Sequence, residues 1–241
     1  MIRSIASATA LTLMTSSFAF AGDLDVWISF DDPANPSKIE IGTADKGTTP
    51  VTFTPDVLVH EAEFGELFPA NVADEPGFFT EQLPPGTIAG FNLTNQLREW
   101  NVTNQTADFS SNTITIFEEL DLSGASATTP SSPGGFTAGF NFIEADATGF
   151  FDDHPTFVLD MPADGIYILA LEATTTTPGV ANSDEFFIVL GYNEGGTFGT
   201  DEQFEEEIEA AVEYATNVLV PAPGAAAVLG LAGIAAIRRK R

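Results

Sequence analysis

Cysteine is absent from this chain of 241 residues, and basic residues are scarce, with 8 Lys and Arg against 35 Asp and Glu. The absence of cysteine excludes disulfides, thiolate nucleophiles and zinc–thiolate sites. The shortage of Lys and Arg leaves no basic patch to displace counterions from phosphates, so nucleic acid and anionic membrane surfaces are unfavourable partners. With only 2 histidines, the chain also offers few groups for acid–base catalysis other than carboxylates.

The shortage of cations is most severe in the middle of the chain. All 35 acidic residues but only three basic ones, Lys38, Lys46 and Arg98, lie between residues 22 and 220, which gives this part a formal charge of −32. Such a charge favours solubility and repels other anions, but repulsion among the acidic side chains also destabilises the folded state. Because salt screens this repulsion, we expect the protein to gain stability from added salt or bound divalent cations.

Residues 1–21 have the pattern of a secretory signal peptide. Arg3 precedes a short apolar run, and the small residues Ala19 and Ala21 stand where signal peptidase requires them. We therefore expect cleavage before Gly22, after which the acidic part begins. A core helix is the alternative, but the lack of acids and the Ala-x-Ala pattern favour the signal peptide.

The other end of the chain combines a short apolar segment with a basic cluster. Residues 222–237 are apolar or small. The segment starts within the motif Pro221-Ala222-Pro223-Gly224, and the basic residues Arg238-Arg239-Lys240-Arg241 follow it. The apolar segment is shorter than the roughly 20 residues that a spanning helix needs. We expect a sorting tail at 221–241 with a transmembrane segment at 222–237. The four cations that follow this segment are expected to stay on the cytoplasmic side of the membrane.

The Pro-x-Pro motif, the apolar helix and the Arg-rich end resemble the PEP-CTERM sorting signal of Gram-negative-type bacteria. The resemblance implies processing by an exosortase, often in species that make extracellular polysaccharide. It covers residues 221–241 only, and Ala222 stands where the family motif has Glu. The expected partners are signal peptidase, an exosortase-like enzyme, the membrane through the tail, and extracellular polysaccharide.

The part between these ends is predicted to be mainly β. Short segments of alternating or β-branched and aromatic residues are separated by Gly, Pro, Asn and Asp, which favours a two-sheet antiparallel sandwich in one domain, residues 22–220. The 21 Phe side chains are expected to pack between the sheets. The predicted strands are Asp25–Phe30, Lys38–Gly42, Thr49–Phe53, Val57–Phe64, Thr87–Asn92, Thr113–Glu118, Gly135–Phe142, Thr156–Leu159, Gly165–Thr174 and Glu185–Gly191.

Two helices are also predicted. Leu93, Leu97 and Trp100 have i, i+4, i+7 spacing with Thr94 as N-cap, which indicates a short helix. A longer amphipathic helix is expected at 201–217, with glutamates near its N-terminus, where the helix dipole favours anions. Its apolar stripe consists of Phe204, Ile208, Ala211, Val212 and Ala215.

One segment has low complexity, and several others carry a second resemblance. Residues 122–135 are dominated by Ser, Thr, Ala, Pro and Gly, which predicts a mobile loop or, alternatively, a linker between two domains.

The second resemblance is to a family of uncharacterised secreted bacterial proteins with this kind of tail. It implies one domain and no named chemistry, and its segments are Asp74–Phe78, Ile88–Asn92, Leu97–Trp100, Asp164–Leu169 and Ser183–Val189.

Motifs for catalysis are missing from the sequence. It has no G-x-S-x-G, no H-E-x-x-H and no phosphate-binding loop. Glu61 and Glu63 have strand spacing and could act as a carboxylate pair, but acids are so frequent that such pairs arise by chance. We expect no enzymatic activity.

Two groups of residues are candidates for ligand binding. Asp152, Asp153 and Asp160, with His154 beside them, offer oxygen ligands to Ca²⁺, although a solvated loop is the simpler interpretation. No other cofactor is expected. A second group could form a carbohydrate-stacking surface, but large aromatic side chains more often fill the core. The members of that group are Trp27, Trp100, Phe78 and Phe79.

Together these features predict an exported, non-catalytic protein of the cell surface or the extracellular matrix. The alternative is a carbohydrate- or calcium-dependent binding module of the extracellular polymer.

Overall fold

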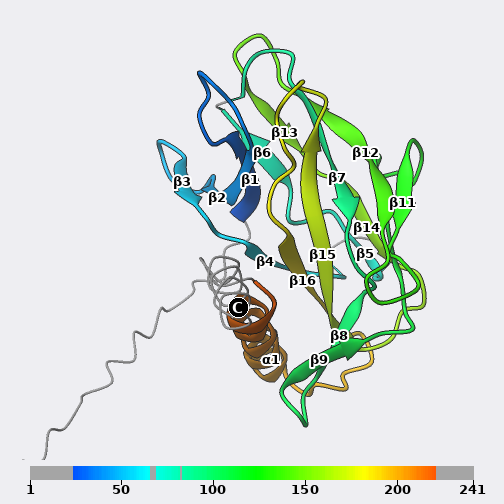
Figure 1. Ribbon diagram of the computed structural model, residues 1–241. Coiled ribbons are helices and arrows are strands. Elements are labelled where there is room, and N and C mark those ends of the chain that lie inside the picture. Colours follow the sequence, from blue (N-terminus) through cyan, green and yellow to red (C-terminus); the bar gives the residue numbers. More distant parts are fainter. Residues whose placement is uncertain (1–23, 66–68, 82, 221–241) are drawn as a thin grey trace, which may run out of the picture.

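The computed structural model of the protein describes residues 24–65, 69–81 and 83–220 (Figure 1). This part is mainly β, as predicted, and ends in an amphipathic helix. The signal peptide, its cleavage site and the sorting tail with its transmembrane segment lie outside the described residues. Among the helices that are described, none has the length and apolarity needed to span a membrane.

The strands form three sheets rather than two. The first has the order β13 (Phe151–Asp153), β6 (Phe78–Thr80), β1 (Leu24–Phe30), β2 (Ile39–Asp45) and β3 (Thr52–Pro55). The second has the order β11 (Ser126–Thr128), β10 (Ile114–Phe117), β14 (Thr156–Leu159) and β5 (Val72–Ala73). The third has the order β12 (Thr137–Glu144), β7 (Ile88–Leu93), β15 (Gly165–Thr175), β16 (Phe186–Tyr192) and β4 (Val59–Glu63), with β8 (Arg98–Asn101) and β9 (Thr106–Phe109) attached to β15.

The prediction of a two-sheet antiparallel sandwich is therefore wrong in two respects. There is one sheet more, and two strand pairs are parallel, β1 with β6 and β16 with β4. Period-two alternation shows which face of a strand is apolar, but it does not say which strand lies beside it or in which direction. Each parallel neighbour is also brought in by a long connection, which leaves no hairpin turn to recognise.

The third sheet is buried on both faces, and this explains the nearly continuous apolar sequence of β15. Tyr167, Leu169 and Leu171 face the main core, which the third sheet shares with strands of the other two sheets. Ile166 and Ile168 face the opposite way, toward the C-terminal helix. The layers are thus the first and second sheets, the third sheet, and the helix.

Aromatic rings fill the main core, as predicted from the number of Phe residues. Phe78, Phe91, Phe157 and Phe186 are at most 1% exposed. Phe78 from the first sheet meets Phe186 from the third with ring centroids 6.4 Å apart and nearly perpendicular planes. Burying each such ring stabilises the fold by about 1.5–3 kcal/mol.

The helix α1 (Asp201–Tyr214) confirms the predicted C-terminal amphipathic helix, and a π-helical turn, η1 (Ala215–Leu219), continues it. Thr200 caps its N-terminus, and the Thr200 and Gln203 side chains exchange bonds with each other's backbone in a capping box. Phe204 and Ile208 are buried against the third sheet. Gly191 allows this close approach, because a Cβ there would lie 2.6 Å from the Phe204 ring.

The predicted short helix beginning at Thr94 is wrong. Leu93 ends β7, and the Thr94 N–H donates to the Ala170 carbonyl, which keeps the backbone bonded to β15. Leu97 fills the main core. Trp100, in β8, packs instead in a second core, which lies between the third sheet and α1. The helical spacing of these apolar residues therefore arose by coincidence, because their side chains pack in two different cores.

The prediction of a mobile loop or linker at 122–135 is also wrong for part of that segment. Ser126–Thr128 forms strand β11 at the edge of the second sheet and pairs with β10. Ala127, only 5% exposed, belongs to the main core.

Candidate functional site

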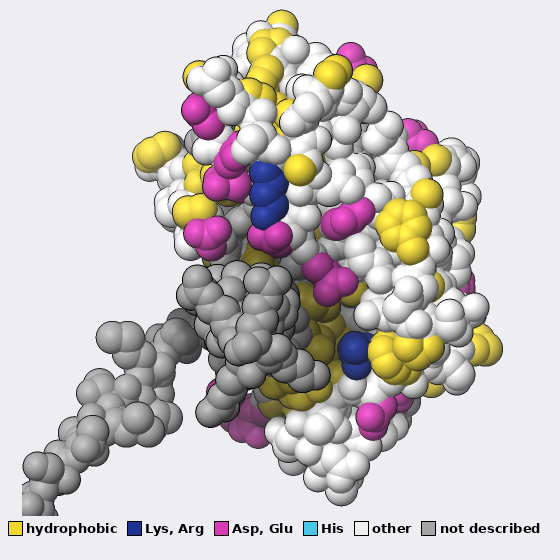
Figure 2. Space-filling model, in the orientation of Figure 1, with side chains coloured by type: hydrophobic (Ala, Val, Ile, Leu, Met, Phe, Trp, Pro, Cys, Tyr) yellow, Lys and Arg dark blue, Asp and Glu magenta, His cyan; other side chains and the backbone are white. Residues whose placement is uncertain are grey.

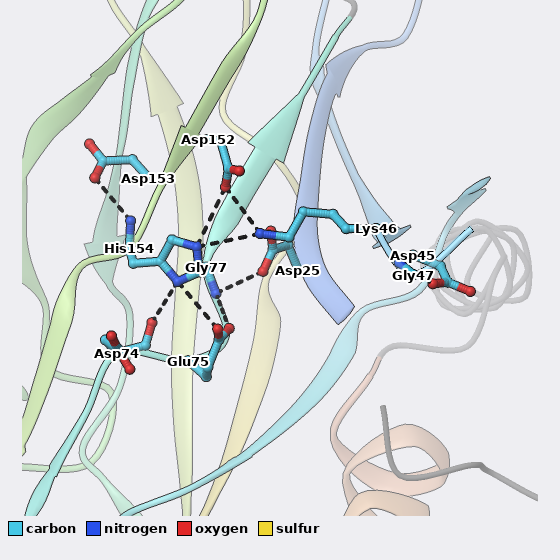
Figure 3. A network of polar contacts seen from close by, with 10 residues as sticks. All are labelled: Asp25, Asp45, Lys46, Gly47, Asp74, Glu75, Gly77, Asp152, Asp153 and His154. Carbon is cyan, nitrogen blue, oxygen red and sulfur yellow. Dashed lines mark hydrogen bonds and ion pairs between the residues drawn. The ribbon is translucent and has the colours of Figure 1, made fainter. Parts of the chain in front are cut away.

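A cluster of charged side chains joins four strands of the first sheet and the loops beside them (Figure 3). Asp25 comes from β1, Lys46 from the turn that follows β2, and Glu75 from the loop before β6. Asp152 lies in β13 and His154 directly follows that strand. The cluster thus holds one of the three basic residues between positions 22 and 220, and one of the two histidines.

Lys46 lies at the centre of the contacts on one side of the cluster. Its Nζ is 2.7 Å from Asp25 Oδ2, 3.2 Å from Asp152 Oδ1 and 3.5 Å from His154 Nε2. Burial raises the pKa of Asp25 and outweighs the opposing effect of Lys46. Burial also disfavours the charged form of Lys46, but the hydrogen bonds and charges of Asp25 and Asp152 together outweigh it and raise the Lys46 pKa. This ion pair keeps a buried carboxylate compensated.

The imidazole of His154 connects Lys46 to the other side of the cluster. Its Nδ1 lies 3.1 Å from the Asp74 carbonyl oxygen and 3.4 Å from Glu75 Oε1. Its Nε2 is 3.5 Å from Asp152 Oδ1. Because a carbonyl oxygen only accepts, the contact with Asp74 places a proton on Nδ1. Burial raises the pKa of Glu75, against the opposing effect of His154.

Gly77 fixes the two carboxylates and the imidazole relative to one another. Its N–H donates to Asp25 Oδ1 at 3.1 Å and to Glu75 Oε2 at 2.9 Å. A Cβ at this position would lie only 2.6 Å from the His154 ring. The position therefore requires glycine because the ring lies against the backbone.

The structure does not bring the three predicted calcium ligands together. Asp152 belongs to the charged cluster, whereas Asp153 accepts a hydrogen bond from the His154 backbone N–H. Asp160 follows β14 in another sheet and accepts hydrogen bonds from the hydroxyls of Thr113 and Thr115. Proximity in sequence suggested a common site, but β13 and β14 belong to different sheets.

Sequence reasoning missed Asp25 and Glu75 as members of the cluster. They lie 50 positions apart in sequence, and they meet because β1 pairs in parallel with β6, the strand that follows Glu75, so no local pattern links them. The one usable signal was Lys46, because a rare cation in so acidic a chain is expected near buried carboxylates.

A second feature is a cavity of about 320 Å³ between the edge strands β3 and β4. Its lining residues are Leu24, Thr43, Asp45, Thr52, Thr54, Val57, Val59, His60, Glu61 and Val212. Burial lowers the pKa of His60 to about 4, and its Nε2 has no hydrogen-bond partner among the described residues. Burial, with repulsion from Glu209, raises the pKa of Glu61. Glu63, the other member of the predicted carboxylate pair, does not line this cavity.

The aromatic residues considered for carbohydrate stacking are core residues. Trp27, Phe78, Phe79 and Trp100 are all between 1% and 6% exposed. The Trp100 indole N–H donates to Glu207 Oε2 at 2.9 Å, which attaches β8 to α1. The expectation of core packing is confirmed, and these four rings do not form a surface for sugars.

Neither a protein-family model, nor a curated protein sequence, nor a solved structure matches this chain.

Proposed function

We propose that this chain is an exported, non-catalytic protein of the cell surface or extracellular matrix. The observation that carries the proposal is the segregation of charge and apolarity along the sequence. Arg3 and a short apolar run precede Ala19-Phe20-Ala21, all acids follow between 22 and 220, and an apolar segment with four terminal cations closes the chain. These are the parts of a signal peptide, a soluble body and a sorting tail.

The fold is consistent with a structural rather than a catalytic body. Lys46 pairs with Asp25 and Asp152, so these two carboxylates are bound to a side chain of the protein itself. These contacts connect β1, the turn after β2 and β13, and thereby tie the edge of the first sheet to its centre. Acidic side chains are scattered over the visible surface with little basic charge between them (Figure 2). Such a surface favours solubility at high salt and repels polyanions.

A binding module of the extracellular polymer is the second candidate function. It is favoured by the cavity between β3 and β4, which threonine residues help to line. A neutral ligand with hydroxyl groups would suit such a wall.

The proposed function is tested by removing residues 221–241 and fractionating the cells. We expect the full-length protein in the envelope fraction and the truncated protein in the medium, because the tail holds the body at the membrane. A variant with Arg238, Arg239, Lys240 and Arg241 replaced by Gln separates the role of the charges from that of the apolar segment. Unchanged cell association of the truncated protein would refute the sorting tail.

A further inference from the structure

We propose that Asp25, Glu75 and His154 form a binding site for one divalent transition-metal ion, Mn²⁺ or Zn²⁺. The proposal does not depend on where the protein acts in the cell. It differs from the calcium site expected at Asp152, Asp153 and Asp160, because two of its ligands come from other parts of the chain.

The first argument is geometric. Each of the three residues offers a ligand atom, and these atoms all lie within 4.8 Å of one another. Zinc bonds to nitrogen and oxygen are about 2.0–2.2 Å long, so ligand atoms around one ion lie up to roughly 4 Å apart. Small side-chain rotations of Glu75 and His154 therefore suffice to close the site. Asp25 is fully buried, whereas the side chains of Glu75 and His154 are partly exposed, so these two residues would move toward it.

The second argument is the charge balance of the cluster. Asp25, Glu75 and Asp152 bring three carboxylates, and Lys46 brings one ammonium, so the cluster carries two uncompensated negative charges when the imidazole is neutral. A divalent ion would cancel that excess.

The third argument concerns a buried oxygen atom. Asp25 is 0% exposed, and the contact of its Oδ2 is the ion pair with Lys46 Nζ, at 2.7 Å. A buried carboxylate oxygen held by one point charge retains lone pairs for a metal ion. Lys46 then remains paired with Asp152 on the far side of the cluster.

The surroundings of His154 fit a metal ligand. The ion would replace the proton that the Asp74 contact places on Nδ1, and Nε2 would then carry the ring proton and face Asp152 Oδ1 at 3.5 Å. A carboxylate that accepts from the second ring nitrogen is the usual outer partner of a metal-bound histidine. The Asp74 carbonyl oxygen, 3.1 Å from Nδ1, is available as a further oxygen ligand.

The set of donor atoms selects the class of metal ion. One imidazole nitrogen with carboxylate and carbonyl oxygens suits Mn²⁺ and Zn²⁺, whereas Ca²⁺ prefers six to eight oxygen ligands. The side chains of Glu75 and His154 are 34% and 30% exposed, so an ion can enter from solvent.

The test is calorimetric titration of the purified, EDTA-treated full-length protein with MnCl₂, ZnCl₂ and CaCl₂. We expect one Mn²⁺ or Zn²⁺ per chain, with at least tenfold weaker binding of Ca²⁺. Glu75→Gln and His154→Gln should each weaken binding of the metal ion at least tenfold. Asp160→Asn is the matched control, because this exposed acid lies outside the cluster and should leave binding unchanged.

A second measurement keeps the test valid if a variant is unstable. Zn²⁺ shifts the NMR signals of the side chains that bind it, so the imidazole signals of His154 should move at one equivalent while those of His60, which lies outside the cluster, stay in place. The absence of one-to-one binding at millimolar metal would overturn the proposal. So would equal shifts of both histidines, or affinity that Asp160→Asn lowers as much as Glu75→Gln does.

Discussion

The Nζ of Lys46 lies 2.7 Å from Oδ2 of Asp25, a carboxylate that has no exposed surface. Breaking a buried ion pair from one side costs about 3–5 kcal/mol, because the remaining charge stays buried without a partner. Lys46→Met should therefore lower the free energy of unfolding by about 3 kcal/mol, at the low end because the Lys46 side chain is 25% exposed. Asp25→Asn in the same chain should recover part of that loss, as measured by urea unfolding.

Lys38 provides the control for that experiment. It pairs with Asp184 at the surface, where the two side chains are 37% and 71% exposed. Lys38→Met should cost less than about 1 kcal/mol, as is usual for exposed pairs. Equal losses for Lys46→Met and Lys38→Met would contradict the interpretation of Asp25 as a buried, compensated charge.

The buried imidazole of His60 predicts a loss of stability in acid. Its pKa is near 6.5 in the unfolded chain and about 4 in the folded one, so the unfolded state binds more protons between these values. The stability that neutral His60 contributes is complete above pH 6.5 and is lost as the pH falls toward 4. For a pKa shift of this size, the free energy of unfolding changes by about 3 kcal/mol. Glu61 acts in the opposite direction, because its raised pKa makes the folded state take up a proton first.

The contribution of His60 is isolated by comparing the wild type with His60→Asn. Unfolding in urea at pH 7.5, 5.5 and 4.5 should show that the wild type loses more stability than the variant over this range. Parallel curves for the two proteins would mean that His60 does not titrate below its ordinary range.

The capping box of α1 predicts a measurable effect of one hydroxyl group. Thr200 accepts from the Gln203 N–H, and Thr200→Ala should lower stability by about 1 kcal/mol. Thr176→Ala is the control, because Thr176 is exposed and lies outside any helix. Thermal unfolding of both variants checks the prediction, and it fails if Thr200→Ala is no more harmful than the control.

Gly77 predicts a coupling with His154. In Gly77→Ala the new Cβ would lie 2.6 Å from the imidazole, so the ring must move and leave Asp74 and Glu75. Overpacking of this kind costs about 1–3 kcal/mol. The double variant Gly77→Ala/His154→Ala should lose less stability than the two single losses combined, because the clashing ring is gone. If the double variant loses as much stability in urea unfolding as the two single variants combined, contact with the His154 ring is not the reason why position 77 requires glycine.

The sequence predicted local features better than relationships between distant segments. Alternating or apolar runs located ten strands, and the amphipathic stripe located α1 because its apolar residues all face one layer. The helix expected from Leu93 to Trp100 failed because those side chains enter two cores, which spacing alone cannot distinguish.

The candidate site was predicted only in part, for a related reason. Asp152 and His154 were recognised because they are neighbours in sequence. Asp25 and Glu75 join them only through the pairing of β1 with β6 and of β6 with β13. Pairing between strands far apart in sequence depends on the whole fold, so neither residue carries a local signal.

The central claim, export of a processed body, is tested most directly by the intact mass of the protein recovered from its native cells. The account predicts a chain that begins at Gly22, located outside the cytoplasm. A full-length chain beginning at Met1 and dissolved in the cytoplasm would contradict it.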